Sequence, residues 1–138
     1  MPILDVKVSA PFSPALVERI SSSLAGLTTS VLQKKPEVIA IAVSFVDPAA
    51  WVIAGKTLAA QGKSSFFLDI RVTDETNTKD EKARYIAEVF RAMGEALREY
   101  GPLHEESYIH VHDVRAAAYG YGGLTQERRY HRPAEPAP

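Results

Sequence analysis

The sequence predicts an α+β fold in which two β-α-β repeats form one mixed sheet, with two helices covering one of its faces. Three observations support this prediction: an internal repeat, strands in which apolar and polar residues alternate, and helices that begin at recognisable caps. The repeat aligns 4–9 (Leu-Asp-Val-Lys-Val-Ser) with 68–73 (Leu-Asp-Ile-Arg-Val-Thr), and every position matches in chemical type. Alternation with a period of two is typical of a strand that buries one face.

The 138 residues are enough for one domain with its own core. We expect this domain to span 1–125, with repeats at about 2–54 and 65–123. The remaining segment, 126–138, contains charged residues and prolines and is expected to be a flexible tail.

Two helices are expected, one in each repeat. The first begins at Ser13, a good N-cap, with Pro14 in the first helical position. The second begins at Thr78, where 78–81 fits a capping box, and ends at Gly101-Pro102. Their apolar stripes are expected to pack on the sheet: Leu16, Ile20, Leu24, Leu27 and Val31, then Ile86, Val89, Phe90, Met93 and Leu97.

A second strand closes each repeat, at 38–44 and at 108–113. Two strands that are joined through a helix lie parallel, so each repeat should contain one parallel pair. Further short strands are candidates at 51–54 and near Tyr119, and 55–65 is expected to be a polar loop.

The two faces of the predicted sheet differ in character. One face is apolar: Leu4, Val6, Val8, Ile39, Ile41, Val43, Leu68, Ile70, Val72, Ile109 and Val111. The other is polar or small-sided: Asp5, Lys7, Ala40, Ala42, Ser44, Asp69, Arg71, Tyr108, His110 and His112. The helices are expected to cover the first face. The second either meets water or lines the inside of an oligomer.

Composition excludes several classes of protein. A net charge of −1 creates no field that attracts nucleic acid or an anionic membrane. The chain has no cysteine, which excludes disulfides, thiolate catalysis and cysteine metal sites. The acidic Asp5 and the lack of a long apolar run argue against a signal peptide and a membrane span. We therefore expect a cytoplasmic protein with no nucleic-acid or membrane partner.

Pro2 is the residue on which the functional prediction depends. Removal of Met1 would leave Pro2 as a secondary amine at the start of the first strand. Burial and nearby cations both disfavour the charged form of an amine. An amine that is neutral near pH 7 is a usable general base. Because proline is also common at the second position for no catalytic reason, other residues must support this role.

Several stretches resemble the tautomerase superfamily, which includes 4-oxalocrotonate tautomerase and macrophage migration inhibitory factor. Besides the proline that opens the first of two repeats, 34–41 (Lys-Lys-Pro-Glu-Val-Ile-Ala-Ile) resembles the Lys-Pro entry to the second strand of the inhibitory-factor branch. Residues 108–113 resemble that branch's Tyr-Ile-Asn-Tyr-Tyr-Asp strand, and 116–121 its Ala-Ala-Asn-Val-Gly-Trp segment. The stretch 71–73 is similar to the arginine-bearing strand of malonate semialdehyde decarboxylase. The resemblance covers roughly 2–123.

The resemblance implies a homotrimer whose sheets surround a central channel and whose active sites lie between neighbouring subunits. It implies that Pro2 moves a proton between carbon and oxygen of an enol or dienol, with a small acidic keto compound as substrate. No cofactor is implied.

The resemblance also assigns roles to other residues. Lys34 or Lys35 matches the active-site lysine, and the choice between them stays open. Tyr108 matches a tyrosine that reaches into the neighbour's pocket. His110 replaces an asparagine, and Tyr121 replaces a tryptophan at the mouth of the pocket. These two differences concern which substrate is bound and leave the role of Pro2 unchanged.

Arg71 has two interpretations. Removal of a proton next to a carbonyl leaves negative charge on oxygen, which a fixed cation must stabilise. Arg71 or the two lysines can supply this cation, and an arginine can also hold a substrate carboxylate in a bidentate manner. Alternatively, Arg71 pairs with Asp69 or Asp5 on the sheet.

Other functions remain open from the sequence. A dehalogenase or decarboxylase of a small three-carbon acid, or a non-catalytic trimer that binds a ligand or partner, fits the same resemblance. His110 and His112 point the same way and could bind a metal together with Asp113 or Glu106. Asp113 lies on the opposite face, however, and we predict no metal site. The strand order also fits ferredoxin-like RNA-binding modules, against which the lack of a basic stripe argues.

Overall fold

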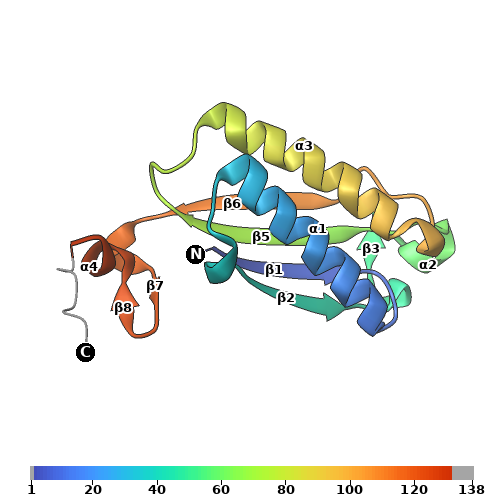
Figure 1. Cartoon of the computed structure of the whole chain (residues 1–138). Helices are drawn as coiled ribbons and strands as arrows, with labels where there is room; N and C mark the ends of the chain where they lie inside the picture. Colours follow the sequence, from blue (N-terminus) through green and yellow to red (C-terminus); the bar gives the residue numbers. More distant parts are fainter. Residues whose placement is uncertain (1, 132–138) are drawn as a thin grey trace.

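The computed structural model describes residues 2–131, and Met1 and 132–138 lie outside the described part. A four-stranded mixed sheet carries two long helices on one face (Figure 1). Its strands are β1 (Ile3–Val8), β2 (Ala40–Phe45), β5 (Phe66–Thr73) and β6 (Tyr108–Val114), in the order β2-β1-β5-β6. Strands β1 and β2 are parallel, as are β5 and β6, whereas β1 and β5 are antiparallel. The predicted fold class and the parallel pair within each repeat are confirmed.

The two repeats are related by a local two-fold axis through the centre of the sheet. In the antiparallel pair, Asp5 lies opposite Asp69, and these are the residues that the internal repeat aligns with each other. Leu4 lies opposite Ile70, and Val6 lies opposite Leu68. The axis therefore passes between Asp5 and Asp69, and the two halves meet edge to edge along β1 and β5.

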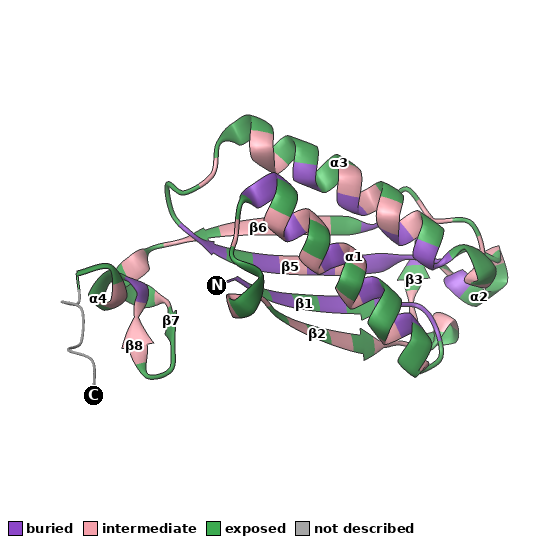
Figure 2. Cartoon of the chain, in the orientation of Figure 1, coloured by how far each residue is buried: buried purple, intermediate pink, exposed green. Residues whose placement is uncertain are grey.

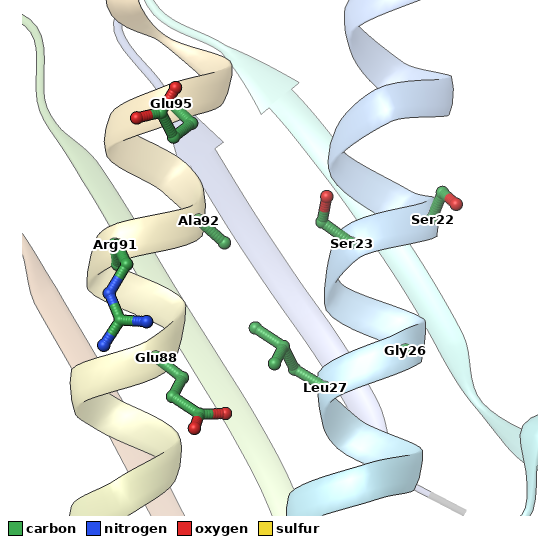
Figure 3. Close-up of a pocket in the computed structure, with 8 residues that line it drawn as sticks. All are labelled: Ser22, Ser23, Gly26, Leu27, Glu88, Arg91, Ala92 and Glu95. Atoms are coloured by element: carbon green, nitrogen blue, oxygen red, sulfur yellow. The ribbon is translucent and has the colours of Figure 1, made fainter.

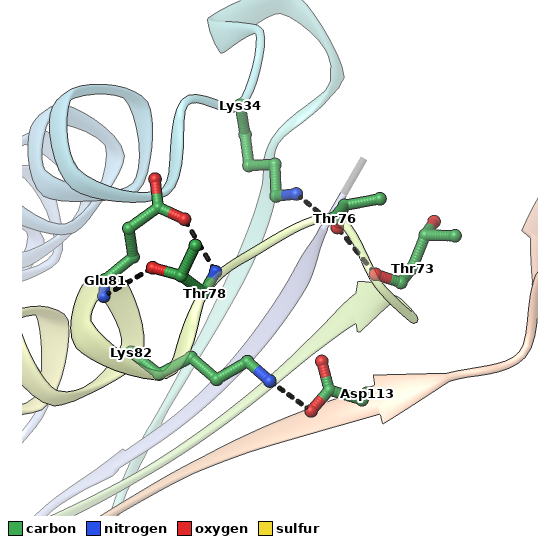
Figure 4. Close-up of polar contacts among 7 residues, drawn as sticks. All are labelled: Lys34, Thr73, Thr76, Thr78, Glu81, Lys82 and Asp113. Carbon is green, nitrogen blue, oxygen red and sulfur yellow. Dashed lines mark hydrogen bonds and ion pairs between the residues drawn. The ribbon is translucent and has the colours of Figure 1, made fainter.

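The helices begin where their caps predict. Helix α1 (Pro14–Leu32) follows Ser13, whose Oγ accepts a hydrogen bond from Leu16 N at 3.2 Å. Helix α3 (Lys79–Ala96) begins with the predicted capping box between Thr78 and Glu81 (Figure 4). It ends at Ala96, earlier than predicted, and a 3₁₀ turn at Arg98–Tyr100 occupies the segment between the helix and Gly101.

The apolar face of the sheet and the inner faces of both helices form the core (Figure 2). The residues of β1 and β5 that were predicted on the apolar face are fully buried, whereas Ile3, on the open face of β1, is 38% exposed. One position on α3 differs, because Ile86 is 40% exposed and Tyr85 is buried in its place. The buried line of α3 is Tyr85, Val89, Met93 and Ala96, a helical spacing that turns Ile86 outward.

Two small hairpins at opposite ends of the sheet complete the repeats (Figure 1). The first is β3 (Val52–Ile53) and β4 (Lys56–Thr57), followed by helix α2 (Leu58–Gln61). The prediction of a polar loop over 55–65 is therefore wrong: Leu58 is fully buried, and Thr57 caps α2. Such an element is hard to read from sequence because two-residue strands have no visible period.

The second hairpin is β7 (Gly120–Tyr121) and β8 (Leu124–Thr125), followed by helix α4 (Gln126–His131). The sequence predicts a flexible tail from 126, but Gln126 is buried and its backbone N–H donates to Tyr119 O at 2.7 Å. The rest of the predicted tail lies outside the described residues. Short 3₁₀ turns precede β2, β3 and β7, at Pro36–Val38, Pro48–Ala50 and Ala116–Ala118. Among residues 2–131, no helix has the length and apolarity that a membrane span requires.

Replacing Tyr85 with phenylalanine is expected to lower the free energy of unfolding by about 1 kcal/mol, because the Tyr85 hydroxyl hydrogen-bonds Thr28 Oγ1 at 2.8 Å inside the core. Burial raises the pKa of Tyr85 to about 12, whereas an unfolded tyrosine titrates near ~10. The contribution of Tyr85 is therefore complete below a pH of about 10 and is lost as the pH rises to about 12. Urea unfolding of the wild type and of Tyr85→Phe should show that the difference between their free energies of unfolding decreases across this pH range. A constant difference would contradict the role given to the Tyr85 hydroxyl.

Candidate active site

Pro2 is buried and lies directly before β1, a central strand of the sheet. Its carbonyl oxygen accepts a hydrogen bond from Ala40 N at 3.1 Å, which ties the start of β1 to the start of β2. Pro2 lines a pocket of about 340 Å³. The other lining residues are Ile3, Glu37, Val38, Ile39, Ala40, Tyr119, Gly120 and Tyr121. The predicted loss of Met1 concerns a residue outside the described part of the chain.

The hairpin β7–β8 forms one wall of this pocket. The Tyr119 hydroxyl donates to Arg71 O at 3.1 Å, which anchors the wall to β5. Burial raises the pKa of Tyr119 above its ordinary value, so this phenol stays neutral near pH 7. Gly120 allows the hairpin to close, because a Cβ there would collide with Leu124 O. Tyr119 and Tyr121 are thereby placed beside Pro2.

A second hollow of about 380 Å³ adjoins the first, and the two share Val38 and Tyr121 as lining residues. Lys34, Lys35 and Arg129 all line this second hollow. Three cationic side chains thus surround a space next to the Pro2 pocket, which suits an anionic group.

Of the two predicted lysines, Lys34 is the one that is partly buried and held by a side-chain hydrogen bond. Its Nζ donates to Thr76 Oγ1 at 2.9 Å, and Thr76 Oγ1 donates to Thr73 O at 2.6 Å (Figure 4). Burial lowers the pKa of the Lys34 ammonium, and the charges of Glu81 and Asp113 oppose this shift. Lys35 is exposed.

Arg129 was missed by the sequence prediction. Its Nη2 donates to Tyr121 O at 2.7 Å, and its guanidinium lies 3.8 Å from the centre of the Tyr121 ring. Its Nε is buried and has no hydrogen-bond partner among the described residues. The only sequence signal was a cationic pair, Arg128-Arg129, in a segment that was expected to be flexible. Its position depends on α4, which the pattern did not reveal.

The remaining predicted residues lie on the open face of the sheet and line neither hollow. Arg71 comes nearest to the Pro2 pocket, because it lies opposite Ile3 and its charge partly offsets the raised pKa of Tyr119. Tyr108 is 58% exposed, and His110 and Arg71 are also exposed. No ion pair of Arg71 occurs within residues 2–131; Asp69 instead contacts His112, with Oδ2 2.9 Å from Nε2. Within one chain, Pro2 and Tyr121 line one hollow, and Tyr121 and the two lysines line the other. Tyr108, His110 and Arg71 line neither of them.

Two other hollows lack comparable chemistry. The local two-fold axis relates the Pro2 pocket to a hollow of about 370 Å³ beside Trp51 and Phe67. In the repeat alignment Pro2 corresponds to Phe66, which is inside the chain and offers no amine. Another hollow, about 510 Å³, is a groove between α1 and α3, lined by Glu88, Arg91 and Glu95 among others (Figure 3). Neither is lined by a residue at the start of the chain, so neither can offer an N-terminal amine.

Comparison with known proteins is informative at the level of the fold. No family model matches the sequence, and no curated protein matches it. Among solved structures, a fused 4-OT described as an asymmetric trimer matches with a TM-score of 0.78 at 17% identity, over 94% of this chain and 99% of that chain. A macrophage migration inhibitory factor-like protein from Entamoeba histolytica matches with a TM-score of 0.68 at 16% identity, over 90% of this chain and 97% of that chain.

A malonate semialdehyde decarboxylase that was inhibited by 3-bromopropiolate also matches, with a TM-score of 0.65 at 15% identity, over 97% of this chain and 99% of that chain. At these identities the matches show a shared fold that extends over nearly the whole chain. They leave the chemistry to be argued from the residues of the pocket.

Proposed function

We propose that this chain, which has the fold of the tautomerase superfamily, is a cytoplasmic tautomerase that uses Pro2 as a general acid-base on the enol or dienol of a 2-keto acid. The observation that carries the proposal is the place of Pro2, buried in the wall of a pocket of about 340 Å³ at the start of β1. Removal of Met1 would expose a secondary amine to that pocket.

The proposed reaction needs only one proton carrier. Pro2 nitrogen, as the neutral amine, takes the proton from the enol hydroxyl and then, as the ammonium, gives that proton to carbon, which restores the neutral amine. Burial of Pro2 and the cations of the adjoining hollow both favour the neutral amine. The Tyr121 hydroxyl is the candidate donor for charge that develops on the substrate oxygen, because the Tyr119 hydroxyl already donates to Arg71 O.

The adjoining hollow provides a place for the substrate carboxylate. Lys34 approaches it from the segment that follows α1, Arg129 approaches it from α4, and Lys35 also lines it. A planar guanidinium suits a carboxylate because two parallel hydrogen bonds can form. The unpartnered Nε of Arg129 supports this role, since a buried donor without a partner is costly unless a ligand satisfies it. Tyr121, shared by both hollows, would then lie against the body of the substrate.

A homotrimer would complete the site. Structural neighbours that are described as trimers support this assembly. In such a trimer the exposed Tyr108 and Arg71 can act in a neighbouring subunit's pocket, which neither reaches within its own chain. Arg71 would then face a substrate carboxylate or the developing oxyanion.

The purified protein is expected to accelerate ketonisation of enolised phenylpyruvate, with saturation kinetics and no added metal or cofactor. Absorbance of the enol measures the rate directly. Malonate semialdehyde and a 3-haloacrylate should be assayed on the same samples, because the match to a decarboxylase makes chemistry on a three-carbon acid the second candidate function. Turnover of one of these acids without enol ketonisation would replace the tautomerase proposal. A trimer without any turnover would favour a ligand-binding role.

A further inference from the structure

We propose that Asp69, His110 and His112 form a binding site for one divalent transition-metal ion per chain, on the open face of the sheet. One ligand atom from each of these side chains lies within 4.8 Å of the other two. The cluster is distinct from the Pro2 pocket and from the cationic hollow, because none of its members lines either of them.

The register of β5 and β6 builds the cluster. Asp69 on β5 lies directly opposite His110 on β6, and His112 lies two residues further along the same strand. Because residues that are two apart share a face of a strand, all three side chains project from the open side of the sheet. The sequence could place the two histidines together, but Asp69 joined them only through the pairing of β5 with β6.

The side chains already converge. His112 Nε2 lies 2.9 Å from Asp69 Oδ2, and the rings of His110 and His112 are stacked with their centroids 3.6 Å apart. Around a tetrahedral ion with metal–ligand bonds of about 2.0–2.2 Å, the ligand atoms are about 3.3–3.6 Å apart. Small rotations of the exposed His110 ring are therefore enough to bring three ligands onto one ion.

The donor set defines the class of ion. Two imidazoles and one carboxylate suit Zn²⁺, Co²⁺, Ni²⁺ or Cu²⁺ better than Mg²⁺ or Ca²⁺, which prefer oxygen ligands. Three protein ligands leave one tetrahedral position for water. The site is also accessible, because the His112 side chain is 32% exposed and that of Asp69 is 20% exposed.

The charges around the cluster are mixed. Asp5 on β1 lies directly opposite Asp69, so two carboxylates adjoin each other at the centre of the sheet. Arg71 lies opposite His112, and its positive charge disfavours a bound cation. Like charges on directly opposite residues destabilise a sheet. A bound cation would offset the repulsion between Asp5 and Asp69.

The test uses tag-free protein that has been dialysed against a chelator. Titration with ZnCl₂ in a calorimeter should give one ion per chain, and Co²⁺ should produce the visible absorption of a tetrahedral complex with nitrogen ligands. His110→Ala removes an exposed ligand, and Asp69→Asn removes the carboxylate. Each should weaken Zn²⁺ binding by more than the roughly 10–100-fold that loss of an outer-sphere partner costs. His131→Gln removes an exposed histidine of α4 and should leave affinity and Co²⁺ spectrum unchanged.

Circular dichroism and melting temperatures of the metal-free variants show whether they are folded, and Asp69→Asn provides a second test if His110→Ala is unstable. Three results would overturn the site: no Zn²⁺ binding by the wild-type chain, an unchanged Co²⁺ spectrum in both ligand variants, or one ion for every three chains. None of these readouts depends on enol turnover, so failure of the metal site and failure of the tautomerase proposal are separate outcomes.

Discussion

Chains that retain Met1 are expected to lose tautomerase activity completely, whatever their other residues. Acylation by Met1 converts the Pro2 nitrogen into a tertiary amide, which has no basicity. A positioned general acid-base typically contributes about 10²–10⁴-fold to a rate. Mass spectrometry measures the processed fraction in each preparation, and ketonisation of enolised phenylpyruvate is followed on the same samples. Activity should increase in proportion to the fraction of chains that begin at Pro2.

Two chemical controls sharpen this test. Alkylation of the free amine should abolish turnover, and peptide mapping should locate the modification at Pro2. Pro2→Ala leaves a primary amine in the same place, so it should keep partial activity, which distinguishes loss of the base from loss of the fold. Full activity in a wholly Met1-retained sample would rule out the proline mechanism.

Ala42→Arg is expected to convert the proposed trimer into monomers. Ala40, Ala42 and Ser44 form a row of small, exposed side chains on the open face of β2, which permits close approach by another subunit. An arginine at 42 fills that space. Within its own chain it is tolerated, because the residue opposite Ala42 on β1 is Asp5. Light scattering should therefore report the mass of three chains for the wild type and of one chain for the variant.

The matched control is Ala83→Arg, which adds the same side chain to the exposed surface of α3. It should remain a trimer with unchanged melting temperature. Activity should fall only in Ala42→Arg, because the proposed sites take residues from neighbouring subunits. A wild-type monomer at micromolar concentration, or a trimeric Ala42→Arg protein, would contradict the proposed assembly.

The secondary structure and the two faces of the sheet were predictable because their signals are local. The caps at Ser13 and Thr78 mark helix starts within four residues, and alternation along β1 and β5 separates buried from open positions. Repetition of one pattern in both halves made the mixed sheet predictable as well. The position of Pro2 at the start of β1 follows from the same reasoning.

Predictions at the margins of these patterns were less successful. Ile86 and Tyr85 both border the apolar stripe of α3, and packing against α1 determines which of them is buried. Tyr85 can be buried because its hydroxyl forms a hydrogen bond with Thr28 of α1. The hairpins β3–β4 and β7–β8 have strands of only two residues, too short for a periodic signal.

By itself, the sequence determined the α+β fold, the two-fold repeat and the candidacy of Pro2, because these depend on residues that are close along the chain. The tertiary structure alone decided which distant residues meet. It placed Arg129 against Tyr121 through α4, brought Lys34 to the same hollow, and set Asp69 beside His112 through the register of β5 and β6. Asp69 and His112 are 43 positions apart, whereas Arg129 and Tyr121 are only eight apart. In each case the geometry depends on the packing of whole elements, which no local pattern records.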